Sequence, residues 1–458
     1  MPLIIPANSA VSSGYEVSNS LRFNSGSSDY LTFVPSSTSN QKTWTVSCWV
    51  KRSKLSANQY VWGVNGDTNG DYFTELLFNS SNQLEFRQGG TVGDPYQTQY
   101  KTNRLFRDIA WYHIVIAADT TDSTVADRLK IFINGVQETS FATTNPPSQN
   151  ENFRWHFNNY NHSIGRSGSH STNYFSGYIA EWIDVDGQQL AADQFGEFDD
   201  DSGIWKPINI SGLTLGTNGA YLDFEDSSAL GNDAAGSNNF TVNNLTAIDQ
   251  TTDTCTNNFC TMNPLDTYNS PTITSGNTIC NAGGSDKAMR STIGISSGKW
   301  YWEVNTTANN SANMGIINGE AVLTDGNSLQ SVSTNSVIWE GNGGLLFKNG
   351  SSVTTAYSGG TSTYGFALDL DNGTLKLSQN GTFYNSGNAV VTSITADTYL
   401  PFFAPNGGGS PTEFKANFGN PAYAISSGNT DGNGYGNFEY AVPSGYYSLN
   451  TKNLAEYG

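Results

Sequence analysis

The segment Tyr364–Gly381, YGFALDLDNGTLKLSQNG, constrains the fold more than any other part of the sequence. Its apolar residues stand at every second position on both sides of an Asn372-Gly373 pair. Period-two patterning predicts strands with one buried face, and Asn-Gly accepts the positive φ angles of a type I′ turn. We therefore predict an antiparallel hairpin in which Asp369 and Asp371 lie on the solvated side of the first strand.

The composition favours turn-rich β structure throughout the chain. Charged residues make up only 13% of the 458 residues, aromatic residues reach 12%, and there are 48 glycines. Helical bundles depend on Ala, Leu, Glu and Lys, whereas strands favour aromatic and β-branched residues. The length exceeds the usual size of a single core, so two or three domains are expected.

Charge and hydropathy exclude two classes of partner. A net charge of −19 repels phosphate backbones, so we expect no nucleic-acid partner. The opening MPLIIPANSAVSSGYEV lacks the basic region and the long apolar run of a signal peptide. Because no run of about 18 apolar residues follows, we predict synthesis in a cytoplasm and no membrane insertion.

The strand patterns divide the chain into five segments. Residues 1–19 form an N-terminal arm, and 20–210 form a first β-sandwich that contains another hairpin turn, at Asn134-Gly135, and one short helix, at Leu190–Phe198. Residues 211–266 are polar and irregular, and we predict a connector whose short strands, AYLDFED and NFTVNNL, pack on a neighbouring domain. A second β unit spans 267–420, and 421–458 form an arm or strap rich in Gly, Asn and Tyr.

Several motifs resemble known families. SLRFNSGSSDYLTF, AWYHIVIAAD, KIFINGV and FSGYIAEWIDVDGQQLAADQF resemble, in order, the strands of the laminin-G-like, concanavalin A-type family. GKWYWEV, YGFALDLDNGTLKLSQNG, YLPFFAP and ANFG resemble a SPRY domain. The resemblance implies an all-β chain of two antiparallel β-sandwiches, a concanavalin A-like jelly roll and then a SPRY-like sandwich, with a packed connector.

The two ends of the chain carry a further resemblance. MPLIIPANSAVSSGYEVSNSLRFN, the connector sequence TVNNL and the closing PSGYYSLNTKNL are similar to structural proteins of marine bacteriophages of the cyanophage type. This resemblance implies a virion protein that is assembled in the host cytoplasm and later becomes extracellular.

Catalytic motifs are absent or incomplete. Retaining glycosidases of the concanavalin A-like fold carry E-x-D-x-E along one strand, which places all three acids on one face. The nearest match has Glu181, Asp184 and Asp186, and the first two stand three residues apart, which predicts opposite faces. The G-x-S-x-G match at 294–298 precedes the strand KWYWEV instead of a helix, so we interpret it as a turn. We predict a non-enzymatic protein.

The histidines and cysteines are interpreted as structural. His113 alternates with apolar residues and is expected to be packed and hydrogen-bonded, whereas His156, His162 and His170 are expected on a solvated loop surface. Cys48 is expected as a buried thiol. For Cys255 and Cys260 a short-loop disulfide and free thiols both stay open, while C-x4-C lacks the second ligand pair of a zinc finger.

One stretch has the spacing of a calcium ligand set. Asp67, Asn69 and Asp71 follow the D-x-N-x-D pattern that gathers hard oxygen ligands around Ca²⁺. The Gly and Glu that an EF-hand loop requires at its sixth and twelfth positions are replaced by Tyr72 and Phe78, so that motif fails. Calcium bound by a rim loop and a plain Asn-Gly turn both remain open.

Sugar binding by such sandwiches needs aromatic platforms beside Asp, Asn and Gly. The best candidates on predicted loops are Trp62, Tyr72, Trp155, Tyr160 and Tyr174, with Trp339 in the second unit. We predict a tail-fibre or surface-displayed adhesion module that binds host-surface glycan, as a homo-oligomer by analogy with fibres. The alternative is a capsid-decorating or tail structural protein that binds neighbouring virion subunits.

Overall fold

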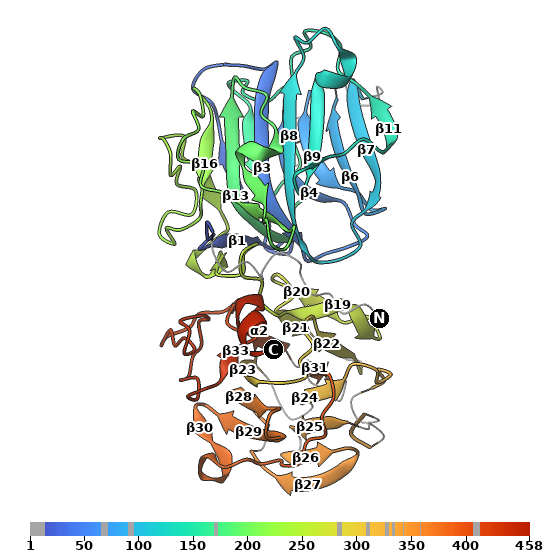
Figure 1. Cartoon of the computed structure of the whole chain (residues 1–458), viewed down its shortest axis with the longest axis vertical. Coiled ribbons are helices and arrows are strands. Elements are labelled where there is room, and N and C mark those ends of the chain that lie inside the picture. Colours follow the sequence, from blue (N-terminus) through green and yellow to red (C-terminus); the bar gives the residue numbers. More distant parts are fainter. Residues whose placement is uncertain are drawn as a thin grey trace. The chain divides into compact units, whose positions relative to one another are not determined.

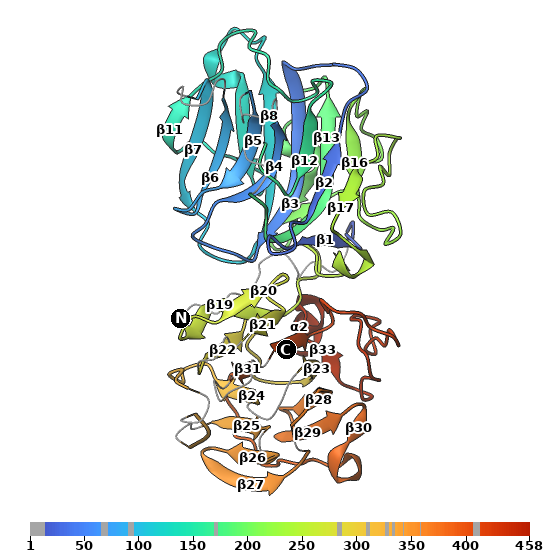
Figure 2. The same ribbon diagram turned by 180° about the vertical axis from the view of Figure 1, so that it is seen from behind.

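The computed structural model describes residues 14–65, 72–89, 96–168, 173–281, 286–307, 312–325, 329–331, 335–341, 343–357, 359–405 and 413–458. The described residues form two compact units, the first ending at Thr256 and the second beginning at Asn257. Strands account for nearly all regular structure in each unit (Figures 1 and 2). No helix within these ranges is long and apolar enough to cross a membrane. The chain is an all-β protein, as predicted.

The first unit contains two large antiparallel sheets. Sheet A has the order β10 (Val136–Gln137), β9 (Leu129–Ile133), β8 (Trp111–Asp119), β3 (Thr43–Arg52), β13 (Gly177–Asp186), β1 (Ser20–Phe23) and β18 (Gln250–Thr251), and β16 (Ala220–Leu222) pairs with β13. Sheet B has the order β11 (Phe141–Asn145), β7 (Thr98–Leu105), β6 (Gln83–Gln88), β5 (Thr74–Phe78), β4 (Gln59–Asn65), β12 (Asn161–Ile164), β2 (Tyr30–Phe33) and β17 (Thr241–Asn243).

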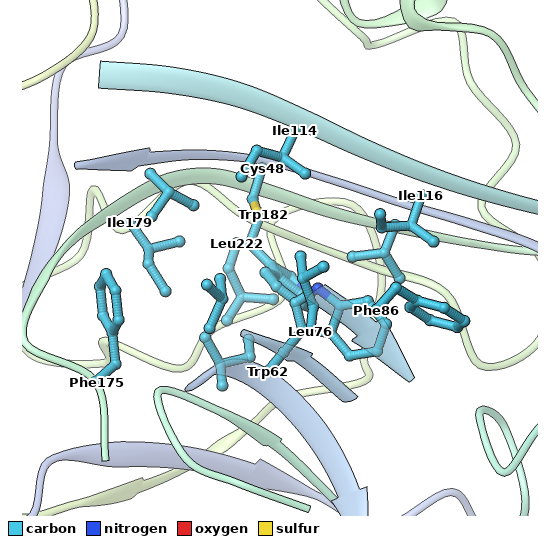
Figure 3. Close-up of a cluster of buried hydrophobic side chains, with 14 of the residues drawn as sticks. Cys48, Trp62, Leu76, Phe86, Ile114, Ile116, Phe175, Ile179, Trp182 and Leu222 are labelled. Atoms are coloured by element: carbon cyan, nitrogen blue, oxygen red, sulfur yellow. The ribbon is translucent and has the colours of Figure 1, made fainter. Parts of the chain in front are cut away.

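The facing sides of the two sheets form the main core of the first unit. Cys48, Ile114 and Trp182 come from sheet A, and Trp62 and Phe86 come from sheet B (Figure 3). All five side chains are buried, because alternate residues of each strand point into the space between the sheets. The core is rich in tryptophan, which provides large apolar area per residue.

Sheet A is also buried on its other face, which faces away from sheet B. Trp49, Val115 and Ile183 on that face pack against Phe195 and Trp205 from the segment that follows β13. Burial on both faces explains why β8, WYHIVIAAD, is almost continuously apolar, and why the Thr and Ser residues that alternate along β3 after its first residue are buried as well. We call the segments that cover this side of sheet A the outer layer.

Residues predicted as a connector complete the first unit. Strands β16, β17 and β18 all lie between residues 211 and 256, and they pair with β13, β2 and β1 respectively. The short helix expected at Leu190–Phe198 is one 3₁₀ turn, Ala192–Gln194, followed by β14 (Gly196–Phe198), which pairs with β15 (Trp205–Pro207). Of the predicted N-terminal arm, residues 1–13 lie outside the described ranges.

The second unit also contains two large sheets. One has the order β19 (Met262–Tyr268), β22 (Ala288–Ser291), β31 (Tyr399–Pro405), β24 (Ala312–Asn318), β25 (Ser336–Glu340), β26 (Leu345–Lys348) and β27 (Ser351–Thr355). The other has the order β20 (Thr272–Thr274), β21 (Ile279–Asn281), β32 (Glu413–Asn417), β23 (Lys299–Thr306), β28 (Ser362–Asp369), β29 (Thr374–Gln379) and β30 (Thr382–Phe383). Their shared core contains Trp300, Trp302 and Phe366.

The Asn-Gly pairs at 134–135 and 372–373, both predicted as hairpin turns, form different turns. Asn134 and Gly135 have φ values of 48° and 79° and join β9 to β10 as the two central residues of a hairpin, as predicted. In the second hairpin, Asp369 pairs with Thr374, so four residues form the turn. Within that turn only Gly373 has a positive φ, so the type I′ prediction is wrong there.

The acidic residues beside the second turn explain the difference. The Asp369 carboxylate accepts hydrogen bonds from the backbone and side-chain nitrogens of Asn372, both at 2.9 Å. Asp369 also pairs with Lys299 at 3.2 Å and is buried, while Asp371 accepts from the backbone of Gly298 at 2.8 Å. The prediction of a solvated strand face is therefore corrected for Asp369, which is buried, whereas Asp371 is exposed as predicted but lies in the turn, beyond the end of β28.

The C-terminal segment 421–458 packs along the second unit as a strap. The buried Glu303 carboxylate accepts hydrogen bonds from the backbone N–H groups of Glu439 (3.0 Å) and Tyr440 (2.9 Å). Farther along, β33 (Tyr447–Ser448) pairs in parallel with β23, and the chain ends in the helix α2 (Thr451–Tyr457). Of the two forms predicted for this segment, the structure has the strap.

Candidate functional site

Three of the predicted sugar platforms are core residues. Trp62, Trp155 and Trp339 are each 1% exposed or less. The rings of Trp62 and Trp155 lie 4.7 Å apart between sheets A and B, and Trp339 packs 4.5 Å from the ring of Tyr364 in the second unit. No ring face of these tryptophans is open to a ligand, so their assignment to loop surfaces is corrected.

The three predicted tyrosines keep part of their surface but lie in separate surroundings. Tyr72 is covered on one face by the Arg154 guanidinium, 4.7 Å from the ring centroid. Tyr160 packs 4.9 Å from Phe157, and Tyr174 packs 5.8 Å from Tyr30. The structure describes no contact that gathers the three rings into one platform.

The predicted metal and disulfide residues add no site to the described part of the chain. Asp67, Asn69 and Asp71 lie outside the described residues, so the calcium prediction stays a prediction. Within the described ranges no group of three or more His, Cys, Asp or Glu side chains is arranged to hold a metal ion. Cys255 and Cys260 are buried free thiols, one in the outer layer of the first unit and the other in the core of the second.

Strand β13 carries three buried acids on two faces. A β-bulge interrupts its pairing with β3 between Ala180 and Ile183, and Glu181 within the bulge has a φ of 48°. Beyond the bulge Trp182 points into the core and Ile183 into the outer layer. Glu181 consequently lies on the outer-layer side and Asp184 on the core side. Their spacing of three residues predicts this placement on opposite faces, and the prediction is confirmed.

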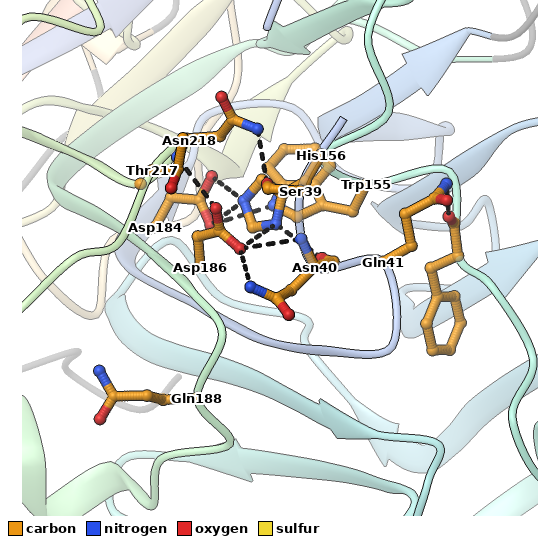
Figure 4. A network of polar contacts seen from close by, with 12 residues as sticks. Ser39, Asn40, Gln41, Trp155, His156, Asp184, Asp186, Gln188, Thr217 and Asn218 are labelled. Atoms are coloured by element: carbon orange, nitrogen blue, oxygen red, sulfur yellow. Dashed lines mark hydrogen bonds and ion pairs between the residues drawn. The ribbon is translucent and has the colours of Figure 1, made fainter. Parts of the chain in front are cut away.

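On the core side the acids form a closed network with histidine (Figure 4). The Nε2 atom of His156 lies 3.0 Å from Asp184 Oδ2, and its Nδ1 atom lies 3.0 Å from the carbonyl oxygen of Asn40 and 3.5 Å from Asp186 Oδ1. Trp155 Nε1 donates to Asp184 at 3.0 Å. His156, Asp184 and Asp186 are all buried.

The electrostatics of this network are those of a structural ion pair. Burial opposes the charge on His156, but attraction to Asp184 and the hydrogen bond between them, with further attraction to Asp186, raise its pKa. Burial likewise opposes the charge on Asp186, and His156 with surrounding hydrogen bonds holds the pKa of that carboxyl below its usual range. The network ties the 152–160 loop to β13.

The other histidines are also packed. His162 is 1% exposed, and burial followed by repulsion from His156 lowers its pKa to about 3. The expectation that His156 and His162 lie on a solvated surface is therefore corrected, while His170 lies outside the described residues. His113 is packed and hydrogen-bonded as predicted, 2.8 Å from the Ser47 hydroxyl and 3.0 Å from Trp205 Nε1.

A cavity of about 490 Å³ opens on the outer-layer side of β13, in the first unit. Hydroxyl, carboxylate and amide groups line it together with aliphatic side chains; its lining comprises Tyr15, Asn209, Ile210, Ser211, Leu213, Leu215, Tyr221, Asp223, Glu225, Ala234 and Ala235. The volume lies within the range of about 300–1,000 Å³ that is typical of small-ligand sites. This cavity is the candidate functional site.

Two tyrosine hydroxyls connect the cavity to Glu181. The Tyr221 hydroxyl lies 2.9 Å from Glu181 Oε2, the Tyr15 hydroxyl lies 3.3 Å from the same oxygen, and the two hydroxyls are 3.0 Å apart. Burial raises the pKa of Glu181 to about 7, although both tyrosine hydrogen bonds oppose that rise. Burial and then the Glu181 charge raise the pKa of Tyr15 to about 12, so its hydroxyl stays protonated.

Sequence reasoning missed this cavity, although part of its signal was present. In AYLDFED, the residues Tyr221, Asp223 and Glu225 alternate with Leu222 and Phe224. The structure places the first three along the cavity and the other two in the core. The alternation therefore predicted one face that carries an aromatic ring and two acids. Nothing local to the sequence indicated that Tyr15 meets this face.

Comparisons with known proteins agree with the fold. The family model described as the concanavalin A-like lectin/glucanases superfamily matches residues 25–182, about a third of the chain. No curated protein matches the chain.

Solved structures with similarity to the chain are distant. Mouse laminin α1 domains LG4-5 share 12% identity over 91% of each chain, with a TM-score of 0.30. The human HERC1 SPRY domain shares 15% identity over 34% of this chain and 96% of its own, with a TM-score of 0.28. A putative carbohydrate-binding protein from Bacteroides ovatus shares 16% identity over 50% of this chain and 59% of its own, with a TM-score of 0.34.

At these TM-scores the structural similarities carry no argument about activity. The fold and the family match fit together, because residues 25–182 supply most strands of both sheets of the first unit. The first unit of this chain contains a laminin G-like, concanavalin A-like domain, and SPRY domains are among the structures similar to the chain.

Proposed function

We propose that this chain is a non-enzymatic adhesion module that binds glycan in the outer-layer cavity beside β13. The observation that carries the proposal is the combination of groups in that cavity. Sugars are recognised by hydrogen bonds to their hydroxyl groups and by apolar contact with their C–H faces. Tyr15, Tyr221, Asp223 and Asn209 supply the polar groups and ring surface, and Leu213 supplies apolar surface.

The family match supports glycan binding for the domain that includes β13. Residues 25–182 match a model of lectins and glucanases, and domain folds host binding and catalysis on different site residues. The choice of binding over hydrolysis rests on β13, where Glu181 and Asp184 lie on opposite faces. A retaining glycosidase needs two carboxyl groups about 5–5.5 Å apart beside the same sugar bond.

The binding surface proposed is a cavity, whereas the sequence predicted the ends of the loops. This distinction is testable with matched tyrosines. Tyr221 lines the cavity, while Tyr174 is a half-exposed loop tyrosine away from its lining. A glycan array probed with the wild-type protein, Tyr221→Ala and Tyr174→Ala should show loss of binding for Tyr221→Ala alone. Loss for Tyr174→Ala alone would return the site to the loops.

The fold of each variant needs an independent check, because the Tyr221 hydroxyl also bonds to buried Glu181. Thermal unfolding of Tyr221→Ala should retain the cooperative transition of the first unit, and Tyr221→Phe should bind weakly while staying fully folded. Cleavage of any arrayed polysaccharide would overturn the non-enzymatic assignment.

The proposal extends to the place of the protein on a phage particle. We propose a tail-fibre or surface-displayed module, with host-surface glycan and other virion proteins as partners, supported by the resemblance of both chain ends to marine phage structural proteins. Complete silence on the array, combined with tight binding to isolated particles, would favour the decorating or tail-structural role. Immunogold labelling of particles would distinguish a tail tip from a capsid surface.

A further inference from the structure

The charged side chains that line the outer-layer cavity are all negative. Among the described residues that line it there are two carboxylates, Asp223 and Glu225, and no lysine, arginine or histidine. A third carboxylate, Glu181, lies behind the hydroxyls of the lining tyrosines. Burial and the nearby Glu225 charge raise the pKa of Asp223, although a hydrogen bond from the Glu225 backbone opposes that rise.

One basic residue near the cavity, Lys206, is paired with acids. Lys206 approaches Gly14, the neighbour of Tyr15, but its Nζ atom pairs with Asp199 at 3.1 Å and Glu197 at 3.3 Å. It therefore offers no free positive charge to a ligand in the cavity.

The acidic and tyrosine side chains of the cavity also favour a ligand that donates hydrogen bonds. Carboxylates accept hydrogen bonds and do not donate them, and the tyrosine hydroxyl protons point toward Glu181 or toward each other. These carboxylates and tyrosines therefore offer acceptors to a ligand, while Asn209 and Ser211 in the same lining add side chains that can also donate. An ammonium group, with three donors and a positive charge, fits both properties, whereas a carboxylate or sulfate ester fits neither.

We propose that the cavity selects glycans that carry free amino groups, of the glucosamine type, over N-acetylated and acidic glycans. The inference rests on the proposed glycan-binding function and names its ligand class. The ammonium binds beside half-buried Asp223 and exposed Glu225, and the partial burial of Asp223 keeps its attraction from being fully screened by salt. The aliphatic Leu213 and Leu215 leave room for the C–H face of the ring.

Matched oligosaccharides test the selection directly. Isothermal titration calorimetry with the full-length chain should compare a β-1,4-linked glucosamine hexamer, its N-acetylated counterpart and a hexamer of uronic acid at the same pH and ionic strength. We expect the amino form to bind at least about tenfold more tightly than the acetylated form, a difference of 1.4 kcal/mol. The uronic acid hexamer should show no binding.

Charge-neutral variants identify the groups responsible. Asp223→Asn and Glu225→Gln preserve shape, and together they should reduce affinity for the amino form at least about tenfold while leaving the acetylated form unchanged. Asp201→Asn is the matched control, because Asp201 is exposed in the same unit and does not line the cavity. Raised salt should weaken the amino form more than the acetylated form.

The outcomes of these experiments distinguish amine selection from the glycan-binding function on which it rests. Equal binding of the amino and acetylated hexamers, lost in Tyr221→Ala, would refute amine selection and leave glycan binding in the cavity intact. Silence with all three hexamers would refute amine selection, and silence on the glycan array as well would refute glycan binding. Binding of tetralysine as tight as that of the amino hexamer would show a general cation site and overturn the assignment to sugars.

Discussion

Strand β13 carries buried acidic residues on both faces, and their surroundings differ. On the core side, Asp184 and Asp186 are paired with His156, and further hydrogen bonds from Trp155 and Asn40 complete the network. On the outer-layer side, Glu181 has two tyrosine hydroxyls as its side-chain partners, and those tyrosines line a cavity.

The difference teaches how to separate structural from functional acids in a sandwich. The core-side acids are compensated by a cation that burial alone would disfavour, and their network is enclosed. Glu181 lacks such a cation among its strongest interactions and is held in a positive-φ bulge, a conformation that non-glycine residues adopt at some energetic cost. A buried acid that is not compensated, beside a cavity, is the better candidate for function.

Removing the core-side cation should have the largest effect. His156→Ala leaves two buried carboxylates without their partner, which should lower the free energy of unfolding of the first unit by about 3–5 kcal/mol. Chemical denaturation followed by tryptophan fluorescence measures this change, since Trp155 lies beside the network. A loss below about 1 kcal/mol would mean that the network is not the compensated ion pair described above.

The charge on the outer-layer side should appear in the pH dependence of stability. The pKa of Glu181 is raised in the folded protein to about 7, so its contribution is fully present below the unfolded value and is lost as pH rises through 7. Between pH 5 and 8 the wild-type first unit should lose on the order of 1–3 kcal/mol from this group. Glu181→Gln should flatten that part of the profile.

The same experiment on the core side should give a different profile. The raised pKa of His156 contributes stability below its unfolded value that is lost as pH rises through the folded value. The lowered pKa of Asp186 contributes stability above its unfolded value that is lost as pH falls through the folded one. If Glu181→Gln and the wild type share one profile, the loss near neutrality comes from His156 instead.

The smallest expected effect is at the tyrosine hydroxyl. Tyr221→Phe removes one hydrogen bond to Glu181 at the edge of a cavity that water can enter, so stability should fall by about 0.5–1.5 kcal/mol. Thermal unfolding of Tyr221→Phe and of His156→Ala, measured side by side, compares the two faces of β13 directly. If Tyr221→Phe lowers the free energy of unfolding as much as His156→Ala does, the tyrosine pair has a structural role instead of a binding role.

The local patterns predicted the strands well, because alternation and turn chemistry act between neighbouring residues. Asn134-Gly135 forms the predicted two-residue turn. Asn372-Gly373 does not, because the Asp369 side chain binds Asn372 and stabilises a four-residue turn. That competing contact depends on side-chain geometry, which the Asn-Gly rule does not include.

The candidate site was less predictable because it depends on contacts between distant segments. Trp155 and His156 lie in a polar stretch that is typical of a surface loop, yet Asp184 on β13 draws both into the interior. Tyr15 and Tyr221 are 206 residues apart and meet over Glu181. Sequence patterns show which face a residue occupies, but not which remote segment covers that face.

The most direct test of the account is a crystal structure of the chain with a bound oligosaccharide. The account predicts a sugar ring in the outer-layer cavity, in contact with Tyr221 and Asp223, and an unchanged His156–Asp184 pair on the other face of β13. A sugar bound at the loops around Tyr160 and Tyr174, with the cavity holding only water, would contradict it.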